Sequence, residues 1–202
     1  MESHGLRDKA LKAIDNTDFY PSKGKERIKS MIETRPDWCV SRQRVWGVPL
    51  PIFISKKTGD VLVDDEVFEN IAKIYEKEGS DCWFNDDYQI FLGDKYKAED
   101  YEKLSDIVEV WFDSGSTHSF VLEKRDDLKW PASMYLEGSD QHRGWFHSSL
   151  LESCGTRGVA PFESILSHGF VVDGKGLKMS KSTGNVIAPQ DILKKYGACL
   201  LY

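Results

Sequence analysis

Two lysines three residues apart mark the stretch of this sequence that is best suited to chemistry. Lys178 and Lys181 lie in the run K-M-S-K-S, which follows D-G-K-G-L and precedes T-G-N. At this spacing both ammonium groups can reach one polyanion, and the nearby glycines let the backbone bend toward it. The G-x-x-x-x-G-K-[ST] pattern of a rigid phosphate cradle is missing, so the charge must come from mobile lysines. The pattern indicates a phosphate-handling loop, with a solvated basic surface loop as the alternative.

The segments before this loop alternate between strand and helix patterns. We predict strands at 107–112, 134–136, 162–166 and 169–172. Helices are expected after the second of these strands, ending near Cys154, and between Pro189 and Gly197. Such alternation predicts a parallel α/β sheet, which binds ligands at the carboxyl ends of its strands. Trp111, Glu137 and the lysine loop fall at those ends.

The amino-terminal half has a different pattern. The elements predicted there are a helix after Ser22, a strand at 38–40, a hairpin of 51–55 with 61–63, and a helix capped by Asp64 or Asp65 that ends at Gly79. From 56 to 105 the chain is acidic, rich in loops and free of phosphate or metal motifs, as expected of an insertion. The predicted division is therefore 1–55, 56–105 and 106–202.

Composition limits the classes of function. Hydrophobic residues make up 40% and charged residues 30% of the 202 residues, which is typical of a globular chain. The net charge of -6 argues against a protein that coats nucleic acid, so any RNA contact must be a local patch. The four cysteines lack metal or disulfide spacing and indicate reduced thiols in the cytoplasm. No apolar run approaches the roughly 20 residues of a membrane span, so no membrane partner is predicted.

Four segments resemble the class I aminoacyl-tRNA synthetases, and among them the isoleucine-tRNA ligases. They are R-P-D-W-C-V-S-R-Q-R-V-W-G from Arg35, W-F-D-S-G-S from Trp111, L-E-G-S-D-Q-H-R-G-W-F from Leu136, and the lysine loop. They occur in the order of that family. The resemblance implies an α/β fold, the second half of a HUP-type Rossmann-like nucleotide-binding domain, with a small α+β insertion at 56–105.

The resemblance also implies the reaction and its residues. Isoleucine would attack the α-phosphate of ATP, supplied with Mg²⁺, to give isoleucyl-adenylate and pyrophosphate, before transfer to tRNA(Ile). Lys181 and then Lys178 are the expected catalytic contacts to phosphate. The expected ATP and adenylate contacts are Glu137, Gly138, Asp140, Gln141, Gly169, Phe170 and Lys181, although Asp140 also fits a plain helix cap. No residue is predicted to bind a metal directly.

Three further groups of residues keep two interpretations each. Trp111 and Trp145 are candidate walls of the aliphatic amino-acid pocket, or else buried core tryptophans. Arg42 and Arg44 are candidates for contacts to phosphates of tRNA or ATP, or for ion pairs within the fold. His142 and His168 are expected to be structural, because the reaction needs no general base.

The first signature of the class, H-x-G-H, occurs nowhere in the chain. We therefore expect a piece of a larger, monomeric cytoplasmic synthetase, inactive by itself because the histidines and the lysines act on one triphosphate. The alternatives are a module that binds adenylates or tRNA without catalysis, and a synthetase for valine or leucine.

Overall fold

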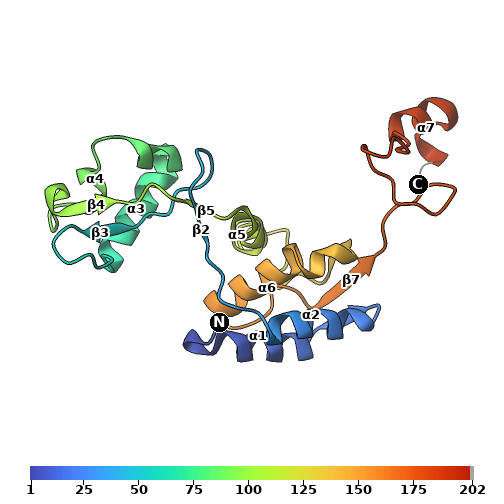
Figure 1. Ribbon diagram of the computed structural model, residues 1–202, viewed down its shortest axis with the longest axis horizontal. Coiled ribbons are helices and arrows are strands. Elements are labelled where there is room, and N and C mark those ends of the chain that lie inside the picture. Colours follow the sequence, from blue (N-terminus) through green and yellow to red (C-terminus); the bar gives the residue numbers. More distant parts are fainter. Residues whose placement is uncertain (201–202) are drawn as a thin grey trace.

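The computed structural model describes residues 1–200 as a body, a lobe and an outlying carboxyl-terminal segment (Figure 1). The helices are α1 (Leu6–Asp15), α2 (Lys23–Glu33), α3 (Asp65–Glu78), α4 (Gln89–Leu92), α5 (Val110–Gly115), α6 (Trp145–Thr156) and α7 (Pro189–Tyr196). The strands are β1 (Asp18–Tyr20), β2 (Ser41–Arg42), β3 (Phe53–Ser55), β4 (Tyr101–Lys103), β5 (Ile107–Val108), β6 (Tyr135–Gly138) and β7 (Ser164–His168). Shorter helical turns are Ser3–Gly5, Ser80–Phe84, Ala98–Asp100, His118–Leu122, Ser139–His142 and Ala198–Leu200.

The body is built on a parallel sheet of three strands in the order β1-β7-β6. Tyr135 and Gly138 of β6 lie opposite Ile165 and His168 of β7, so the two strands end at the same edge. β1 pairs with β7 on the other side, at a place where no strand was predicted. The parallel α/β sheet that the alternating pattern predicted is confirmed.

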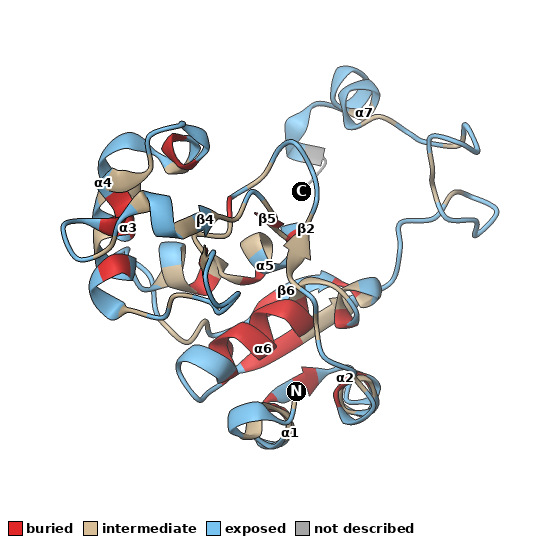
Figure 2. Cartoon of the chain, turned by 60° about the vertical axis from the view of Figure 1, so that its left-hand side comes forward, coloured by how far each residue is buried: buried red, intermediate tan, exposed pale blue. Residues whose placement is uncertain are grey.

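Helix α6 lies at the centre of the body. It packs against α1 and α5, and its residues from Phe146 to Cys154 are all buried, which Figure 2 shows as a continuous red ribbon. Phe146 and Leu150 are fully buried in the same apolar cluster as Ile14, Ile28 and Ile165. A helix covered on every side must accept buried polar groups as well, and α6 contains three serines, a histidine and a glutamate among them.

The lobe has a hydrophobic core of its own. β3 pairs with β4, and α3, α4 and the turn Ser80–Phe84 pack around Trp83 and Phe91, neither of which is exposed to solvent. The Trp83 ring lies 5.0 Å from each of the Phe53 and Phe91 rings, and its Nε1 donates to the Leu104 carbonyl at 2.8 Å. This core coincides with most of the predicted insertion, and Figure 1 shows it on the opposite side of the molecule from α7.

Several predicted elements differ from the structure. The strand at 107–112 ends at Val108, because the Glu109 carboxylate accepts a hydrogen bond from the Trp111 N–H at 3.1 Å and starts α5. The segment 169–172 joins no sheet and makes one isolated bridge from Val172 to Lys178. The strand at 38–40 lies instead at Ser41–Arg42 and pairs with β5.

The hairpin of 51–55 with 61–63 forms only in part. A single bridge joins Ile54 to Val61, flanked by hydrogen bonds from the Ser55 N–H to the Asp60 carbonyl and from the Leu62 N–H to the Phe53 carbonyl, while β4 pairs with the opposite edge of β3.

The predicted helix ends are mostly confirmed. Asp64 caps α3 by accepting a hydrogen bond from the Glu66 N–H at 3.0 Å. Gly79 and Gly197 follow α3 and α7 with φ of 80° each, a value that suits glycine. Ser22 precedes α2 but makes no side-chain cap. Among the described residues, no helix has the length and apolar character needed to cross a membrane.

Separate cores should respond separately to mutation. We expect Trp83→Ala to cost the lobe about 3–5 kcal/mol of local stability, because it removes a fully buried aromatic side chain. Amide hydrogen exchange should then accelerate in residues 53–104 while the strands β1, β6 and β7 keep their protection. Phe68→Ala, which truncates a partly exposed ring on α3, is the control. Equal loss of protection in both regions would show that the two cores unfold as one.

Candidate functional site

The carboxyl end of β6 carries the acidic residues of the predicted adenylate site. Glu137 is exposed, and no side chain among residues 1–200 hydrogen-bonds or ion-pairs with it. Gly138 is buried, and a Cβ there would approach the Asp140 Oδ1 to 2.6 Å, so a larger residue would displace the Asp140 carboxylate. Asp140 is exposed and accepts a hydrogen bond from the Gln141 amide at 3.0 Å. The strand end therefore presents two solvated carboxylates to any ligand at this edge.

Gln141 has a structural contact that the sequence did not indicate. Its Oε1 accepts a hydrogen bond from the Trp145 backbone N–H at 2.9 Å and so satisfies the first free donor of α6. A Cβ on Gly144 would approach the same oxygen to 2.6 Å. Glycine at 144 and glutamine at 141 together fix the direction in which α6 leaves the sheet.

The two tryptophans occupy different environments. Trp145 stacks on Tyr135 with ring centroids 4.0 Å apart and planes 2° apart, and its Nε1 donates to the Ser114 carbonyl at 2.9 Å. Trp111 remains 43% exposed and lies over Gly144, where a Cβ would approach its ring to 3.1 Å. Trp145 thus ties α6 to α5 and the sheet, whereas Trp111 offers ring surface to solvent.

The lysine loop is held by its own hydrogen bonds. Asp173 Oδ1 accepts from the backbone N–H groups of Lys175 and Leu177 at 2.9 and 3.0 Å. Asp173 Oδ2 accepts from the Asn185 amide at 2.8 Å, and the Asn185 Oδ1 accepts from the Ser180 N–H at 3.0 Å. These bonds, the Asn185 bond first, lower the pKa of Asp173. The loop closes on itself through one aspartate and one asparagine.

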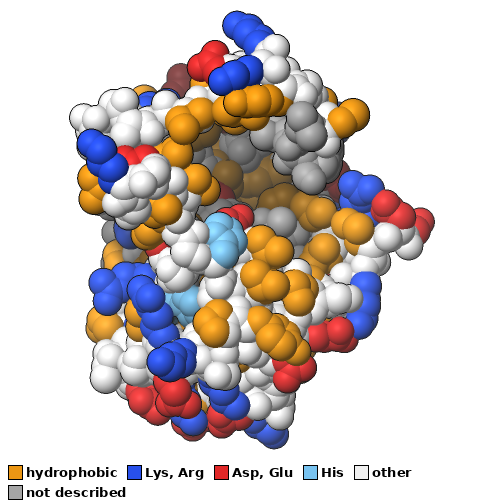
Figure 3. All heavy atoms as spheres, turned by 90° about the vertical axis from the view of Figure 1, so that its right-hand side faces the viewer, with side chains coloured by type: hydrophobic (Ala, Val, Ile, Leu, Met, Phe, Trp, Pro, Cys, Tyr) orange, Lys and Arg blue, Asp and Glu red, His pale blue; other side chains and the backbone are white. Residues whose placement is uncertain are grey.

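The two lysines of the loop have different partners. The Lys178 ammonium lies 3.6 Å from the centroid of the Phe170 ring, a cation–π contact. Lys181 is exposed, and within residues 1–200 no carboxylate pairs with it. Figure 3 shows a hollow between this carboxyl-terminal segment and the body, with hydrophobic side chains on its walls. Phe170, at 47% exposure, and Leu136, at 54%, are among the exposed apolar residues at this end of the sheet.

The structure brings only some of the predicted residues together. Glu137, Gly138, Asp140 and Gln141 adjoin Trp145 and Trp111 through the start of α6, and Phe170 adjoins Lys178. Figure 1 shows the lysine loop standing apart from α5 and α6, across open space. His142 is buried, as expected of a structural histidine, whereas His168 is exposed.

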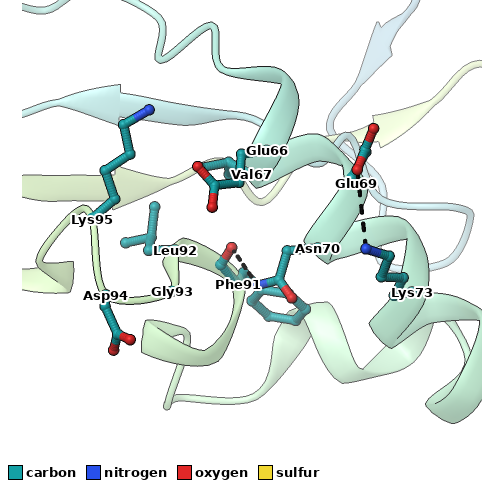
Figure 4. Close-up of a pocket in the computed structure, with 10 residues that line it drawn as sticks. All are labelled: Glu66, Val67, Glu69, Asn70, Lys73, Phe91, Leu92, Gly93, Asp94 and Lys95. Carbon is teal, nitrogen blue, oxygen red and sulfur yellow. Dashed lines mark hydrogen bonds and ion pairs between the residues drawn. The ribbon is translucent and has the colours of Figure 1, made fainter.

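One cavity of the described chain is remote from these residues. Its volume is about 580 Å³, and it lies in the lobe between α3 and α4, where Figure 4 shows Glu66, Asn70 and Lys73 on one side and Lys95 on the other. Half of its lining residues are charged and exposed, namely Glu66, Glu69, Lys73, Asp94 and Lys95. In the described part of the chain, no three His, Cys, Asp or Glu side chains are grouped so as to hold a metal ion.

Three acidic side chains meet where α5 packs on α6. Glu152 is buried, and neither of its carboxyl oxygens has a hydrogen-bond partner in the described chain. A Cβ on Gly115 would approach its carboxyl carbon to 2.8 Å, so this helix contact also depends on glycine. Burial first, and then Asp113 and Glu109, raise the pKa of Glu152 to about 8. No motif or local pattern in the sequence predicted this group.

The chain matches the family described as tRNA synthetases class I (I, L, M and V) over residues 1–201. It is 85% identical over 201 residues to an isoleucine–tRNA ligase of Pelagibacter ubique (strain HTCC1062), covering 100% of this chain and 22% of that protein. It is 58% identical over 196 residues to the isoleucine–tRNA ligase of Zymomonas mobilis subsp. mobilis, covering 97% and 21%. The chain therefore spans about a fifth of the length of these curated relatives.

Two solved structures are similar in fold. A methionyl-tRNA synthetase of Mycobacterium tuberculosis, bound by methionyl-adenylate, aligns with a TM-score of 0.57 at 20% identity and covers 95% of this chain and 29% of that one. A LeuRS of Agrobacterium radiobacter K84, in a ternary complex with tRNA and LeuAMS, aligns with a TM-score of 0.53 at 20% identity and covers 81% and 23%. Both support a Rossmann-like catalytic fold. The chain belongs to the class I tRNA synthetases.

The buried carboxyl group should make stability depend on pH. Because the folded state raises the pKa of Glu152 from 4.5 to about 8, its favourable contribution is complete below pH 4.5 and is lost as the pH rises through 8. We expect Glu152→Gln, which resembles the protonated form, to raise Tm at pH 8.5 and to change it little at pH 5.

The matched control is Glu69→Gln, which neutralises an exposed carboxylate on α3. Thermal unfolding of both variants is measured at pH 5 and pH 8.5. Equal shifts of Tm in Glu152→Gln and Glu69→Gln would contradict the expectation.

Proposed function

We propose that this chain is part of the catalytic domain of an isoleucine–tRNA ligase. The observation that carries the proposal is its 85% identity to the Pelagibacter ubique ligase over its whole length. The parallel sheet, with its acidic strand end and lysine loop, supports an assignment to the second half of a HUP-type nucleotide-binding fold. On this proposal 1–55 leads into the catalytic fold, 56–105 is a connective insertion and 106–202 carries the reaction.

The chemistry requires little covalent help from the protein. The isoleucine carboxylate attacks the α-phosphate of ATP, pyrophosphate leaves, and catalysis consists of alignment and neutralisation of charge. A lysine ammonium about 4 Å from a phosphate oxygen contributes about 4 kcal/mol at an effective dielectric of about 20. Lys181 is free to move to the phosphates, and Lys178 can follow once it leaves Phe170.

The strand end suits the neutral and cationic parts of the substrates. Glu137 and Asp140 would repel phosphates, so we assign them to the amino acid's ammonium and to ribose hydroxyls. Gly138 and Gln141 complete this edge, and Gly169 with Phe170 forms the surface for adenine. A methionyl-adenylate bound in a protein of similar fold supports a ligand of this kind.

The remaining partners follow from the same assignment. Mg²⁺ would arrive on the ATP phosphates, and isoleucine and tRNA(Ile) are the other substrates. We place the whole enzyme in the cytoplasm as a monomer.

The lysine loop can be tested in a chimera in which this chain replaces the matching segment of the Pelagibacter ubique ligase. We expect isoleucine-dependent ATP–pyrophosphate exchange from the chimera. Lys181→Ala should lower its rate at least about 100-fold and leave the KM for isoleucine nearly unchanged, because the contact acts in the transition state.

Lys175→Ala is the matched control, since Lys175 is an exposed lysine of the same loop outside K-M-S-K-S. A chimera that exchanges with leucine or valine in preference to isoleucine would refute the proposed substrate. Equal effects of the two lysine substitutions would remove Lys181 from the mechanism.

The different settings of the two tryptophans predict different kinetic effects. In the same chimera, Trp111→Ala should raise the KM for isoleucine much more than the KM for ATP and leave Tm nearly unchanged, because this ring is partly exposed. Trp145→Ala should lower Tm as well, because it removes the stack on Tyr135. A Trp111→Ala variant with normal KM for isoleucine would exclude Trp111 from the pocket.

A further inference from the structure

A small polar cavity lies where the segment before β2 meets the starts of α5 and α6. Its volume is about 140 Å³, and its lining residues include Arg35, Arg42, Arg143, His147 and Glu109. We call it the arginine cavity. Liquid water occupies about 30 Å³ per molecule, so the cavity has room for one tetrahedral oxyanion and a few waters.

Positive charge in the arginine cavity exceeds negative charge. Three arginines and one glutamate line it, and within residues 1–200 none of the three arginines forms an ion pair within 4.0 Å. Arg42 donates to the Cys39 and Ser41 carbonyls at 2.6 and 2.8 Å, which fixes its position without neutralising it. The Arg35 Nε is buried with no acceptor in the described chain. Buried donors of this kind normally have a partner.

His147 supplies a second, independent sign of a ligand. It is only 3% exposed, it lines the cavity, and neither of its ring nitrogens makes a well-formed hydrogen bond in the described chain, the His142 backbone being a near polar neighbour. Burial, together with the nearby charges of Arg35 and Arg143, lowers the pKa of His147 to about 4. The ring is therefore neutral at pH 7 and holds one N–H donor ready. His147 also lies in the first turn of α6, where the helix dipole favours an anion.

We propose that the arginine cavity binds a phosphate group. Guanidinium forks match the geometry of phosphate oxygens, and a dianion would balance the excess charge that the wall now leaves unmatched. The cavity adjoins Trp111 and Gly144 and uses neither lysine of the K-M-S-K-S loop. It is a second phosphate site on the chain, and it does not depend on the proposed substrate being isoleucine.

The phosphate group bound in the arginine cavity could belong to the end of a nucleotide or to the phosphodiester backbone of an RNA strand. AMP and the dinucleotide CpA distinguish these two sources, because AMP carries one terminal phosphate and CpA carries one phosphodiester. The probe is the ¹⁵N-labelled chain, observed through the imidazole nitrogens of His147 at pH 7. Inorganic phosphate, AMP and CpA are each titrated at constant ionic strength against chloride.

We expect saturable shifts of the His147 resonances with inorganic phosphate and with at least one of the two nucleotides. Phosphate should also raise the pKa of His147, since an anion favours the protonated ring. Arg143→Gln, which changes an exposed side chain and spares the core, should weaken the apparent affinity about tenfold, and Arg35→Gln at least as much. Arg125→Gln, which removes an exposed guanidinium that pairs with Asp127 on the surface, is the control.

Shifts that stay linear in concentration, that chloride reproduces, or that survive Arg143→Gln would overturn the proposal. Saturation by AMP and not by CpA would assign the site to a nucleotide phosphate, and the reverse would assign it to RNA. An Arg35→Gln variant that unfolds leaves the test intact, because Arg143→Gln alone decides between the outcomes.

Discussion

Burial of α6 between α1, α5 and the sheet is the constraint on which the rest of the structure depends. Phe146 and Leu150 are fully buried in this contact, and each such side chain contributes about 1.5–3 kcal/mol. The helix begins directly after the acidic end of β6, so the same packing sets the direction of that strand end. It also fixes α5, because the Trp145 indole donates to the Ser114 carbonyl. The packing of α6 thus sets the positions of both the proposed amino-acid pocket and the proposed adenylate edge.

This packing leaves polar groups without partners inside the body. Glu152, His147 and Ser153 belong to α6, and each has a buried side-chain atom with no hydrogen-bond partner in the described chain. Such groups cost stability unless something satisfies them. Glu152 avoids a buried charge by keeping its proton, whereas His147 lines a cavity together with three arginines. On our proposal, a bound ligand satisfies His147, whereas Glu152 of the same helix stays protonated and neutral.

The lysine loop follows a different principle. It has almost no buried surface, and its shape comes from the hydrogen bonds of Asp173 and Asn185 within the loop. Because few contacts join it to the body, its ammonium groups keep the freedom that catalysis by mobile charge requires. The cation–π contact of Lys178 with Phe170 gives one lysine a defined position while no phosphate is present. On our proposal, the rigid end of β6 aligns the substrates, and the lysine loop neutralises the charge of the phosphates.

The sequence by itself determined the features that depend on local residue chemistry. Asp64 and Gly79 bound α3, Pro189 and Gly197 bound α7, and alternating patterns predicted a parallel sheet, because caps, turns and periodicity act within a few residues. Its motifs also indicated the family. Tertiary structure alone decided that Glu109 would end a strand and start α5, that β1 would join the sheet, and that Trp111 and Trp145 would differ in exposure. It also brought Arg35 beside Arg143 and His147, residues more than a hundred positions apart, because long-range packing sets such contacts and no local pattern encodes them.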